Sequence, residues 1–448
     1  MTADASGAAD GAPSRRLFGL VELRRGEAAP VALAAAYSFC LMASYNVVKP
    51  YREALGTASK GLATLWVGTL VACTVLLIPY WSLVGSFPRQ RFIPWVHRFF
   101  EASFVVFFFL LDEKSPRFMF GAQAFYNGVS AFNLLVISQF WGFMADVFTR
   151  DQGRRLFAWI AAGGTAGALL ASLATQYSQD HRWLAPKELI WPTIVLLELA
   201  SLFALRLARH APPSPWRPPE GAVRRILAAG DGVVRFARSP YLLAIAAYMF
   251  VSLYTSAFVY DFQRVLVKAQ IADRAAQTQY FANVNVWQQL VALAGQLLLS
   301  ARLLATIGLG WTLALLPLAG VAGLATFARD LSIDAIKWVS IGFKGVDYAI
   351  AKPAREALFT VVSRAEKYQS KSLIDAGLYR LFDSIDSLFV DGLRGGGMAA
   401  AAWIACAVSI AGLPISAVLA WLHGKRRAPA GPAAPAAPVE EVDAVAEA

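Results

Sequence analysis

The sequence predicts an all-α polytopic membrane protein with about 12 transmembrane helices, arranged as two halves of six. Composition is the first reason: 57% of the 448 residues are hydrophobic, only 16% are charged, and the mean hydropathy is +0.49. A soluble chain of this length carries about a quarter charged residues. Second, the charges cluster between apolar blocks of about 20 residues, the length that spans a bilayer. Third, an internal repeat indicates a duplicated fold.

The apolar blocks divide into two sets of six. The first set covers residues 29–54, 62–85, 92–111, 118–148, 154–176 and 188–206, and the second covers 241–266, 280–305, 309–328, 333–362, 371–392 and 398–422. The segment between the sets is rich in Pro and Arg and continues as a basic amphipathic pattern, typical of a helix on the membrane surface. The expected parts are an N-terminal segment (1–28), an N-terminal half (29–206), a linker (207–240), a C-terminal half (241–422) and a disordered tail (423–448).

Basic residues near the ends of the blocks predict how the chain crosses the membrane. The N-terminal segment, the even-numbered connections, the linker and the C-terminal end carry the cations, for example Arg89, Arg150 and Lys367. The opposite connections are nearly neutral. Because positively charged connections stay in the cytoplasm, we expect both termini there, in a bacterial inner membrane. This orientation explains the net charge of +11 without a nucleic-acid partner.

Two copies of one seven-residue sequence stand at the ends of apolar blocks. Lys49–Leu55 reads KPYREAL and Lys352–Leu358 reads KPAREAL, so six of seven residues are identical. The alternative is two unrelated helix ends whose cations snorkel to the surface. A second match, at a shift of 211, pairs AAYSF at 35–39 with AAYMF at 246–250. The first, seventh and tenth blocks are therefore related by sequence.

Charged side chains inside the blocks are the main candidate functional residues, because a charge that faces lipid is costly. In the tenth block, polar residues at intervals of seven, four, four and three share one helical stripe: Lys337, Lys344, Tyr348, Lys352 and Arg355. Asp347 and Glu356 lie within about one turn of these cations, so local ion pairs can lower the cost of burial. We expect substrate-binding or gating roles for Lys49, Arg52, Glu53, Lys344, Asp347, Lys352, Arg355, Glu356, Asp375, Arg380 and Asp383.

Amide side chains form a second group of candidates. Asn127, Asn285 and Gln289 are candidates for lining a polar cavity. Hydrogen bonds that hold helices together explain such amides equally well.

Ion pairs that exchange partners are the expected mechanism. Six cations and six anions are expected around the cavity, a balance typical of gates closed by ion pairs. The twelve are Lys49, Arg52, Glu53, Lys344, Asp347, Lys352, Arg355, Glu356, Asp375, Arg380, Asp383 and Asp386. An incoming phosphate can take Arg52 or Arg355 by bidentate hydrogen bonds and release Glu53 or Glu356, which would couple binding to gate movement.

Two shorter motifs predict contacts between helices. Ala145–Arg155 (ADVFTRDQGRR) resembles the loop signature of major facilitators and predicts a latch between Asp146 and an arginine. A positive-inside loop explains this motif equally well. Gly163–Ser172 (GGTAGALLAS) presents small residues at spacings of three and four, which predicts close helix packing.

The whole pattern resembles the major facilitator architecture, in which each six-helix half contains inverted triplets of helices. The resemblance implies that the first, fourth, seventh and tenth helices surround a central cavity. Because the first and tenth helices would run in opposite directions, the Lys49 copy is expected toward the outer end of this cavity. The Lys352 copy is expected toward the cytoplasmic end.

A narrower resemblance is to the non-mitochondrial ATP/ADP translocases of plastids and intracellular bacteria. It is carried by Lys352-Pro353-Ala354-Arg355-Glu356, then Lys367 and Lys371, then Ile374-Asp375, together with Lys49-Pro50-Tyr51-Arg52-Glu53. The resemblance implies that Arg52 and Arg355 stand where that family has functionally important lysines. Pro50 and Lys352 stand where it has acidic residues.

These observations predict a secondary-active transporter that works by alternating access on an anionic phosphorylated metabolite such as a nucleotide, in ATP/ADP-type exchange. The alternatives are a proton-coupled transporter of another small organic solute, with Asp347, Asp375 or Asp383 as proton carriers, and a transporter-fold protein with an accessory role. The sequence has no GxxxxGK loop for ATP-driven pumping, and its four histidines are scattered. We expect no enzymatic activity, no cofactor and no metal. The expected partners of this monomer are its substrate and the lipid bilayer.

Overall fold

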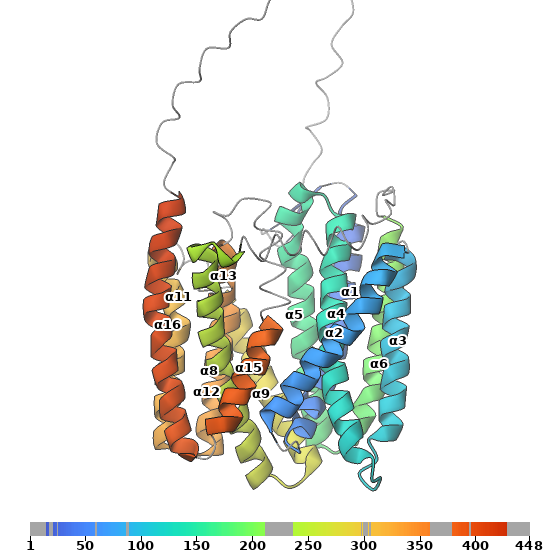
Figure 1. Cartoon of the computed structure of the whole chain (residues 1–448). Helices are drawn as coiled ribbons and strands as arrows, with labels where there is room; N and C mark the ends of the chain where they lie inside the picture. The colour runs from blue at the N-terminus through green and yellow to red at the C-terminus, as the bar shows by residue number, and fades with distance from the viewer. Residues whose placement is uncertain are drawn as a thin grey trace, which may run out of the picture.

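The structure, a computed structural model, describes residues 15–17, 21–24, 26–58, 61–86, 89–210, 236–296, 298, 303, 306–358, 379–393 and 396–427. Long helices run side by side through these ranges (Figure 1). The helix α1 (Ala28–Gly56) begins, and α16 (Met398–Arg427) ends, at the same end of the bundle, which we call the near end. The far end is the opposite one, where α1 and α8 (Pro240–Gln270) finish.

Six long helices and six further helical segments are described on either side of residues 211–235. The first six are α1, α2 (Leu62–Ser86), α3 (Arg89–Leu110), α4 (Phe118–Val147), α5 (Arg150–Asp180) and α6 (Ile190–Ala208), with the short helix η1 (Pro186–Leu189) before α6. The second six are α8, α9 (Arg274–Gly295), α11 (Gly308–Arg329), the continuous segment α12 (Ile333–Val346), η3 (Asp347–Ala351) and α13 (Lys352–Leu358), then α15 (Tyr379–Leu393) and α16. The predicted all-α polytopic membrane fold is therefore confirmed.

A short hairpin precedes the first helix. Its strands β1 (Arg15–Leu17) and β2 (Val21–Leu23) pair antiparallel. The sequence did not predict this pairing, because each strand has only three residues.

Seven of the described helices are long and apolar enough to cross a membrane: Ala28–Gly56, Phe92–Leu110, Arg155–Asp180, Pro186–Ala208, Pro240–Gln270, Gly308–Arg329 and Met398–Arg426. Exposed Trp and Phe side chains cover outer helices such as α3 and α16, for example Phe109 and Trp421. Polar segments such as α9 and α12 place their amides and charges toward other helices, as Asn285 shows with 3% exposure.

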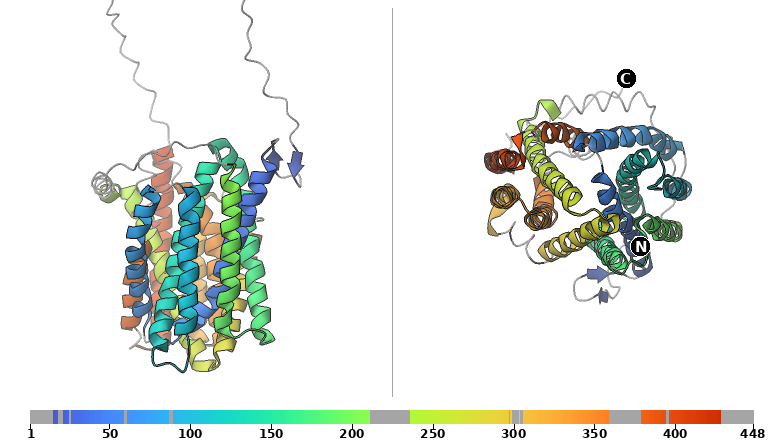
Figure 2. Two further views of the ribbon diagram at one scale, coloured as in Figure 1. Left: turned by 90° about the vertical axis from the view of Figure 1, so that its right-hand side faces the viewer. Right: turned by 90° about the horizontal axis from the view of Figure 1, so that it is seen from below.

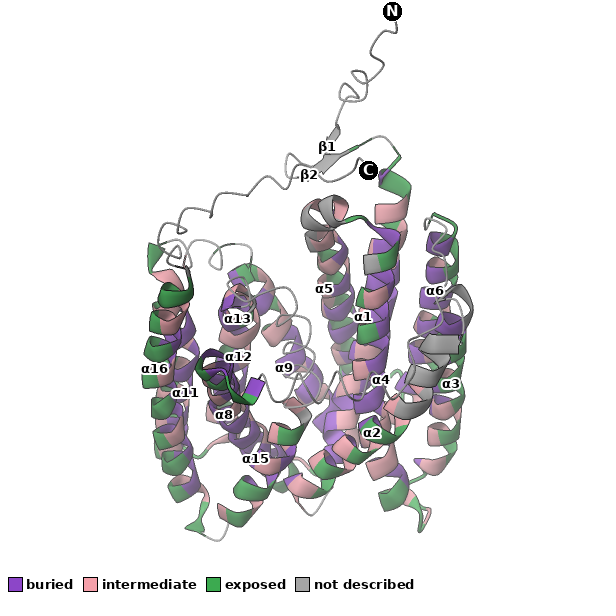
Figure 3. Ribbon diagram, turned by 45° about the horizontal axis from the view of Figure 1, so that its top comes forward, coloured by how far each residue is buried: buried purple, intermediate pink, exposed green. Residues whose placement is uncertain are grey.

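The two halves meet chiefly along three helix pairs, one of which is α1 with α9. The helix α2 packs against α15, and α5 packs against α9 (Figure 2). Buried residues gather on α1 and α8, in the middle of the bundle, while outer helices such as α16 show exposed faces (Figure 3). Charged residues on α1 therefore lie inside protein and away from lipid.

Small residues bring α5 against α1. A Cβ atom on Gly163 would lie 2.7 Å from the carbonyl oxygen of Ala35, and one on Gly164 would lie 2.6 Å from Ser38 Oγ. Only residues without a side chain allow this approach. The close packing predicted for Gly163–Ser172 is confirmed.

The start of α5 differs from the prediction. We expected the helix to begin at residue 154, but it begins at Arg150, because Thr149 caps it and forms a capping box with Gln152. The backbone at Arg150 is therefore helical, whereas the sequence placed this arginine in a connection. Within the motif ADVFTRDQGRR, the capping box explains the roles of Thr149 and Gln152.

Candidate functional site

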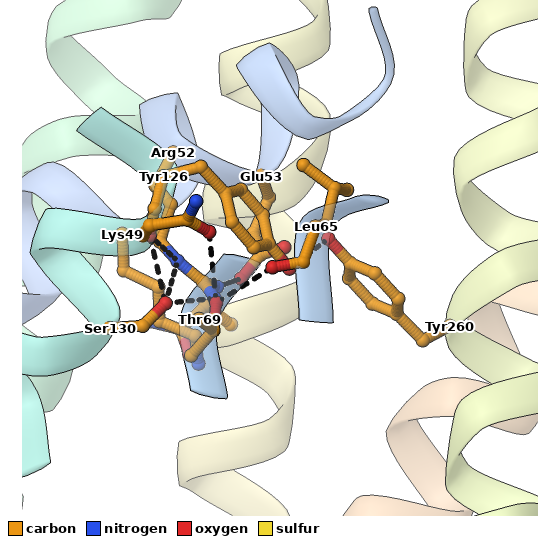
Figure 4. Close-up of polar contacts among 10 residues, drawn as sticks. Lys49, Arg52, Glu53, Leu65, Thr69, Tyr126, Ser130 and Tyr260 are labelled. Carbon is orange, nitrogen blue, oxygen red and sulfur yellow. Dashed lines mark hydrogen bonds and ion pairs between the residues drawn. The ribbon is translucent and has the colours of Figure 1, made fainter. Parts of the chain in front are cut away.

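Arg52 is held in place by its own half of the molecule. Its Nε donates to the Tyr126 carbonyl oxygen at 3.2 Å and its Nη2 to Ser130 Oγ at 2.7 Å, both on α4. Its Nη1 donates to Glu53 Oε1 at 2.5 Å, and the guanidinium carbon lies 3.7 Å from the centre of the Tyr126 ring (Figure 4). Only 13% of the side chain is exposed. Arg52 therefore fastens α1 to α4.

Lys49, one turn earlier on α1, reaches into the other half. Its Nζ donates to Asn285 Oδ1 on α9 at 2.8 Å. The Asn285 amide nitrogen in turn donates to Asn46 Oδ1 at 2.9 Å and to Ser172 Oγ at 2.5 Å. Asn285 thus joins α9 to α1 and α5. It is the one secondary candidate that lies beside a charged candidate in the described contacts.

On the other side of the boundary between the halves, Asp347 pairs with Arg355. Their Oδ1 and Nη2 atoms lie 3.0 Å apart, with 16% and 20% of the side chains exposed. The expected local pair between Lys344 and Asp347 does not form. The Asp347 carboxylate is taken by Arg355 instead. The π-helical turn η3, which starts at Asp347, changes the angular position of the residues after it. The expected single stripe is interrupted there: Arg355 is partly buried, whereas Lys352 is exposed.

We call the following six residues the central cluster: Lys49, Arg52, Glu53, Lys344, Asp347 and Arg355. Glu53 attracts Lys49, and Arg52 and, more weakly, Lys344 across the boundary between the halves repel it. Glu53 likewise acts on Tyr348, next to Asp347. Four cations face two carboxylates in this cluster. The six members of this cluster are therefore positive in sum, whereas the predicted balance of twelve charges also includes Glu356, Asp375 and Arg380, whose side chains lie outside the description.

The remaining candidates lie elsewhere or fall outside the described part. Asn127 Oδ1 accepts from Thr69 Oγ1 at 3.0 Å and so ties α4 to α2, while Gln289 is half-buried on α9. Asp383 is half-buried on α15. The backbones of Glu356 and Arg380 are helical, but their side chains are outside the description. Asp375 lies outside the described residues.

Hydrogen bonds between the halves concentrate at the far end. Asp391 of α15 caps the start of α2, accepting from the Leu62 and Ala63 amides at 3.0 and 2.8 Å. Arg274 of α9 donates to the Ala54 carbonyl oxygen of α1, and Thr57 donates to Gln277 Oε1 at 3.1 Å. Within the described residues, no direct hydrogen bond between side chains or backbones of the two halves lies at the near end.

A buried ion pair also supports this closure, and the sequence analysis missed it. Asp261 Oδ1 and Arg264 Nη2 on α8 lie 2.9 Å apart with 2% and 3% exposure, and Arg264 donates to the Gly56 carbonyl oxygen at 3.4 Å. The 211-residue shift that aligned the first and seventh blocks pairs Arg264 with Glu53. That alignment was the signal that could have identified the pair.

At the near end, an ion pair joins helices of the same half. Arg155 Nη2 lies 2.9 Å from Glu27 Oε1, and Gln152 Nε2 donates to the same oxygen at 3.1 Å. Burial alone would raise the pKa of Glu27, but the hydrogen bonds from Arg155, the Arg24 amide and Gln152 outweigh it and lower the pKa to about 2. Glu27 is thus the acidic partner of Arg155 in this contact, and the latch expected for Asp146 stays a prediction.

No protein-family model and no curated protein matches this sequence. Solved structures share the fold. A bacterial homolog of the human lysosomal transporter Spinster, in an inward-facing and unoccupied conformation, is 12% identical with a TM-score of 0.54, covering 89% of this chain and 96% of that one. The nucleoside transporter NupG is 13% identical with a TM-score of 0.54, covering 89% and 99%.

A third similar structure is a POT family transporter in complex with 5-aminolevulinic acid. It is 10% identical with a TM-score of 0.62, and the match covers 93% of this chain and 99% of that chain. Identities this low establish the fold alone. The chain therefore has the fold of major facilitator transporters, whereas the narrower resemblance to the ATP/ADP translocases finds no support among these structures.

Proposed function

We propose that this protein is a secondary-active transporter that binds a small anionic solute at the central cluster and moves it by alternating access. The fold supports a membrane transporter in general. The concentration of interhalf hydrogen bonds at the far end supports a state in which that end is closed. A solute that bridges the two halves at the cluster would favour closure of the other end.

The single observation that carries the anionic substrate is the pair Lys49 and Lys344. Each belongs to a different half, both are half-buried, and neither forms an ion pair with a described carboxylate. Two ammonium groups that repel each other in a poorly hydrated place attract an anion, because it neutralises both. Arg52 suits this role less than the sequence suggested, since Ser130, Tyr126 and Glu53 already occupy its donors.

Within this class, a phosphorylated metabolite such as a nucleotide is the first substrate to test. Two half-buried tyrosines near the cluster, Tyr45 and Tyr348, are candidates for ring faces on which a base can stack. One protein of similar fold is a nucleoside transporter. ATP/ADP-type exchange is the specific form of this proposal.

Uptake into proteoliposomes tests the proposal. Vesicles loaded with ADP should accumulate labelled ATP, and Lys49→Gln or Lys344→Gln should reduce uptake by at least about tenfold, since each removes one of two charges that hold the anion. Lys268→Gln is the matched control, because Lys268 is an exposed lysine at the end of α8. Equal uptake by all three variants would remove the central cluster from the mechanism.

The alternatives give different results in the same vesicles. A proton-coupled carrier of another organic solute would fail in the nucleotide exchange but would accumulate its solute when a pH gradient is imposed. An accessory protein without transport activity would show no uptake of nucleotides, organic phosphates or other organic anions, with or without a gradient.

A further inference from the structure

The carboxyl group of Asp386 on α15 is buried without a partner. Its exposure is 0%, and neither carboxylate oxygen has a hydrogen bond. An isolated carboxylate inside a protein is so unfavourable that the group takes up a proton instead. The central cluster does not explain Asp386, because none of its cations pairs with it.

The surroundings of Asp386 offer no positive charge among the described side chains. Asp383, one turn earlier on α15, acts on it as a like charge, and Tyr254 of α8 is the titratable group that faces it across the helix contact. The helix α2, which packs on α15, has no charged residue along Leu62–Ser86, and α16 has none before Lys425. These neighbours all favour the neutral acid.

We propose that Asp386 is a proton-binding site whose proton is released when the far end of the transporter opens. The proton passes between a carboxyl oxygen and water, so no other bond changes. In the described state the site is dry and the proton is held. This coupling rests on the proposed function, because it assumes that the far end opens during transport. The protonation of Asp386 in the closed state does not depend on that function.

The link to the far end is the helix itself. Asp391, five residues after Asp386 on α15, accepts hydrogen bonds from the first amides of α2 and so closes the contact between the halves. When α15 leaves α2, water can reach Asp386 along the same helix. A charged Asp386 is then stabilised by hydration and disfavours a return to the closed packing.

Infrared spectroscopy of the purified full-length protein tests the protonation directly. The carbonyl stretch of a protonated carboxylic acid should be present at neutral pH, and Asp386→Asn should remove one such band. Asp383→Asn, one turn away, is the matched control and should keep it. A spectrum that is unchanged in Asp386→Asn would overturn the proton site.

Accessibility of the far end tests the coupling. Thr57 is 1% exposed where α1 meets α9, so Thr57→Cys, with Cys40, Cys73 and Cys406 replaced by serine, should react with a maleimide only after opening. Because a maleimide reacts with the thiolate, the labelling rate is divided at each pH by that of an exposed cysteine, Lys268→Cys, in the same background, and this ratio is the labelling rate compared below. If opening releases one proton, this labelling rate should rise with pH by up to about tenfold per unit. Asp386→Asn in this background should abolish the rise, and Asp383→Asn should keep it.

A second variant shows whether the effects of Asp386→Asn come from loss of the proton site or from misfolding. Asp386→Leu places an apolar side chain where the neutral acid lies, so the folded protein should be at least as stable as the parent above neutral pH. A pH-dependent labelling rate that persists in both Asp386 variants would overturn the coupling. If the parent protein shows the infrared band of Asp386 but neither it nor any variant transports the solute, the result counts against the proposed function and leaves the proton site standing.

Discussion

The two copies of the KPxREAL sequence have nearly identical residues but different surroundings. The first copy, Lys49–Leu55, lies in a regular helix toward the far end, and its Arg52 is 13% exposed and bonded to α4. The second copy, Lys352–Leu358, follows a π-helical turn toward the near end, and its Arg355 pairs with Asp347 of its own segment. The first copy fastens α1 to α4 through its arginine, whereas the second copy is joined to α8 through its backbone, where Tyr241 OH donates to the Leu358 carbonyl oxygen at 2.6 Å.

This difference fits a transporter in which one end is closed. The arginine of the copy at the closed end joins two helices, and the described ion pair of the copy at the other end lies within one helical segment. The inverted placement expected from the sequence agrees with the positions of α1 and α13 in the bundle, although the assignment of the ends to membrane sides stays a prediction.

The largest effect is expected when the first copy loses its arginine. Arg52→Ala leaves the Glu53 carboxylate buried, with Oε2 already lacking a hydrogen bond, so we expect a loss of about 3–5 kcal/mol of stability. Unfolding by heat or denaturant in detergent micelles measures it. Replacing both partners, with Arg52→Met and Glu53→Gln, should restore most of the loss because no buried charge is then left unpaired.

The matched control for Arg52 is Arg98. Its ion pair with Glu198 lies on the outer face of α3 and α6, with 58% and 40% of the side chains exposed, and its atoms are 3.4 Å apart. Arg98→Ala should change the unfolding midpoint little. If Arg52→Ala were as mild as Arg98→Ala, the fastening role of the first copy would be wrong.

The next effect concerns the contact that keeps the far end closed. Asp391→Ala removes two hydrogen bonds to the start of α2, and a lost helix cap of this kind typically costs about 1–2 kcal/mol. The population of the open far end should rise by about 5–30-fold, which is that energy expressed as an equilibrium ratio. The labelling rate of the Thr57→Cys protein measures the rise, and Asp391→Asn, which keeps one acceptor oxygen, should give a smaller one.

How much of this could be read from the sequence depends on what determines each feature. The apolar blocks predicted the helices because a bilayer demands about 20 apolar residues per crossing. They predicted neither the π-helical turn at Asp347 nor the cap by Asp391 on α2. The turn depends on how a whole segment packs, and the cap joins residues more than 300 positions apart, for which a single sequence gives no signal.

The sequence identified buried charged residues as the candidates but did not identify the residues that bond to them. The charge of Lys344 acts on Lys49 beside the Arg52–Glu53 pair, and Asp347 pairs with Arg355, because charges that cannot face lipid gather inside the bundle. Their role in binding or gating stays a prediction. Their partners could not be predicted, since Asn285 and Ser130 reach the cluster from distant helices. Asp386 was counted as one of the cavity charges, yet it lies buried without a partner.

A smaller effect on stability is expected for the ion pair of the second copy. The Arg355–Asp347 pair is less buried than the Arg52 pair, so a double-mutant cycle with Arg355→Gln and Asp347→Asn should give a coupling energy of about 1 kcal/mol. Lys352→Ala should leave stability unchanged, because Lys352 is exposed. A coupling energy as large as that of Arg52 with Glu53 would remove the contrast between the copies.

The smallest effect at neutral pH is expected for Glu27, whose contacts join helices of one half at the near end. Its pKa of about 2 lies below the ordinary value of 4.5, so the folded state is stabilised fully above pH 4.5 and loses this contribution as the pH falls toward 2. With partial solvent screening we expect a contribution below about 1 kcal/mol. The difference in melting temperature between the parent and Glu27→Gln should therefore shrink between about pH 7 and pH 3. A difference that stays constant over this range would mean that the Glu27 carboxylate is not held ionised by Arg155, and the near end would then lack the one ion pair that ties the start of α1 to α5 in the described residues.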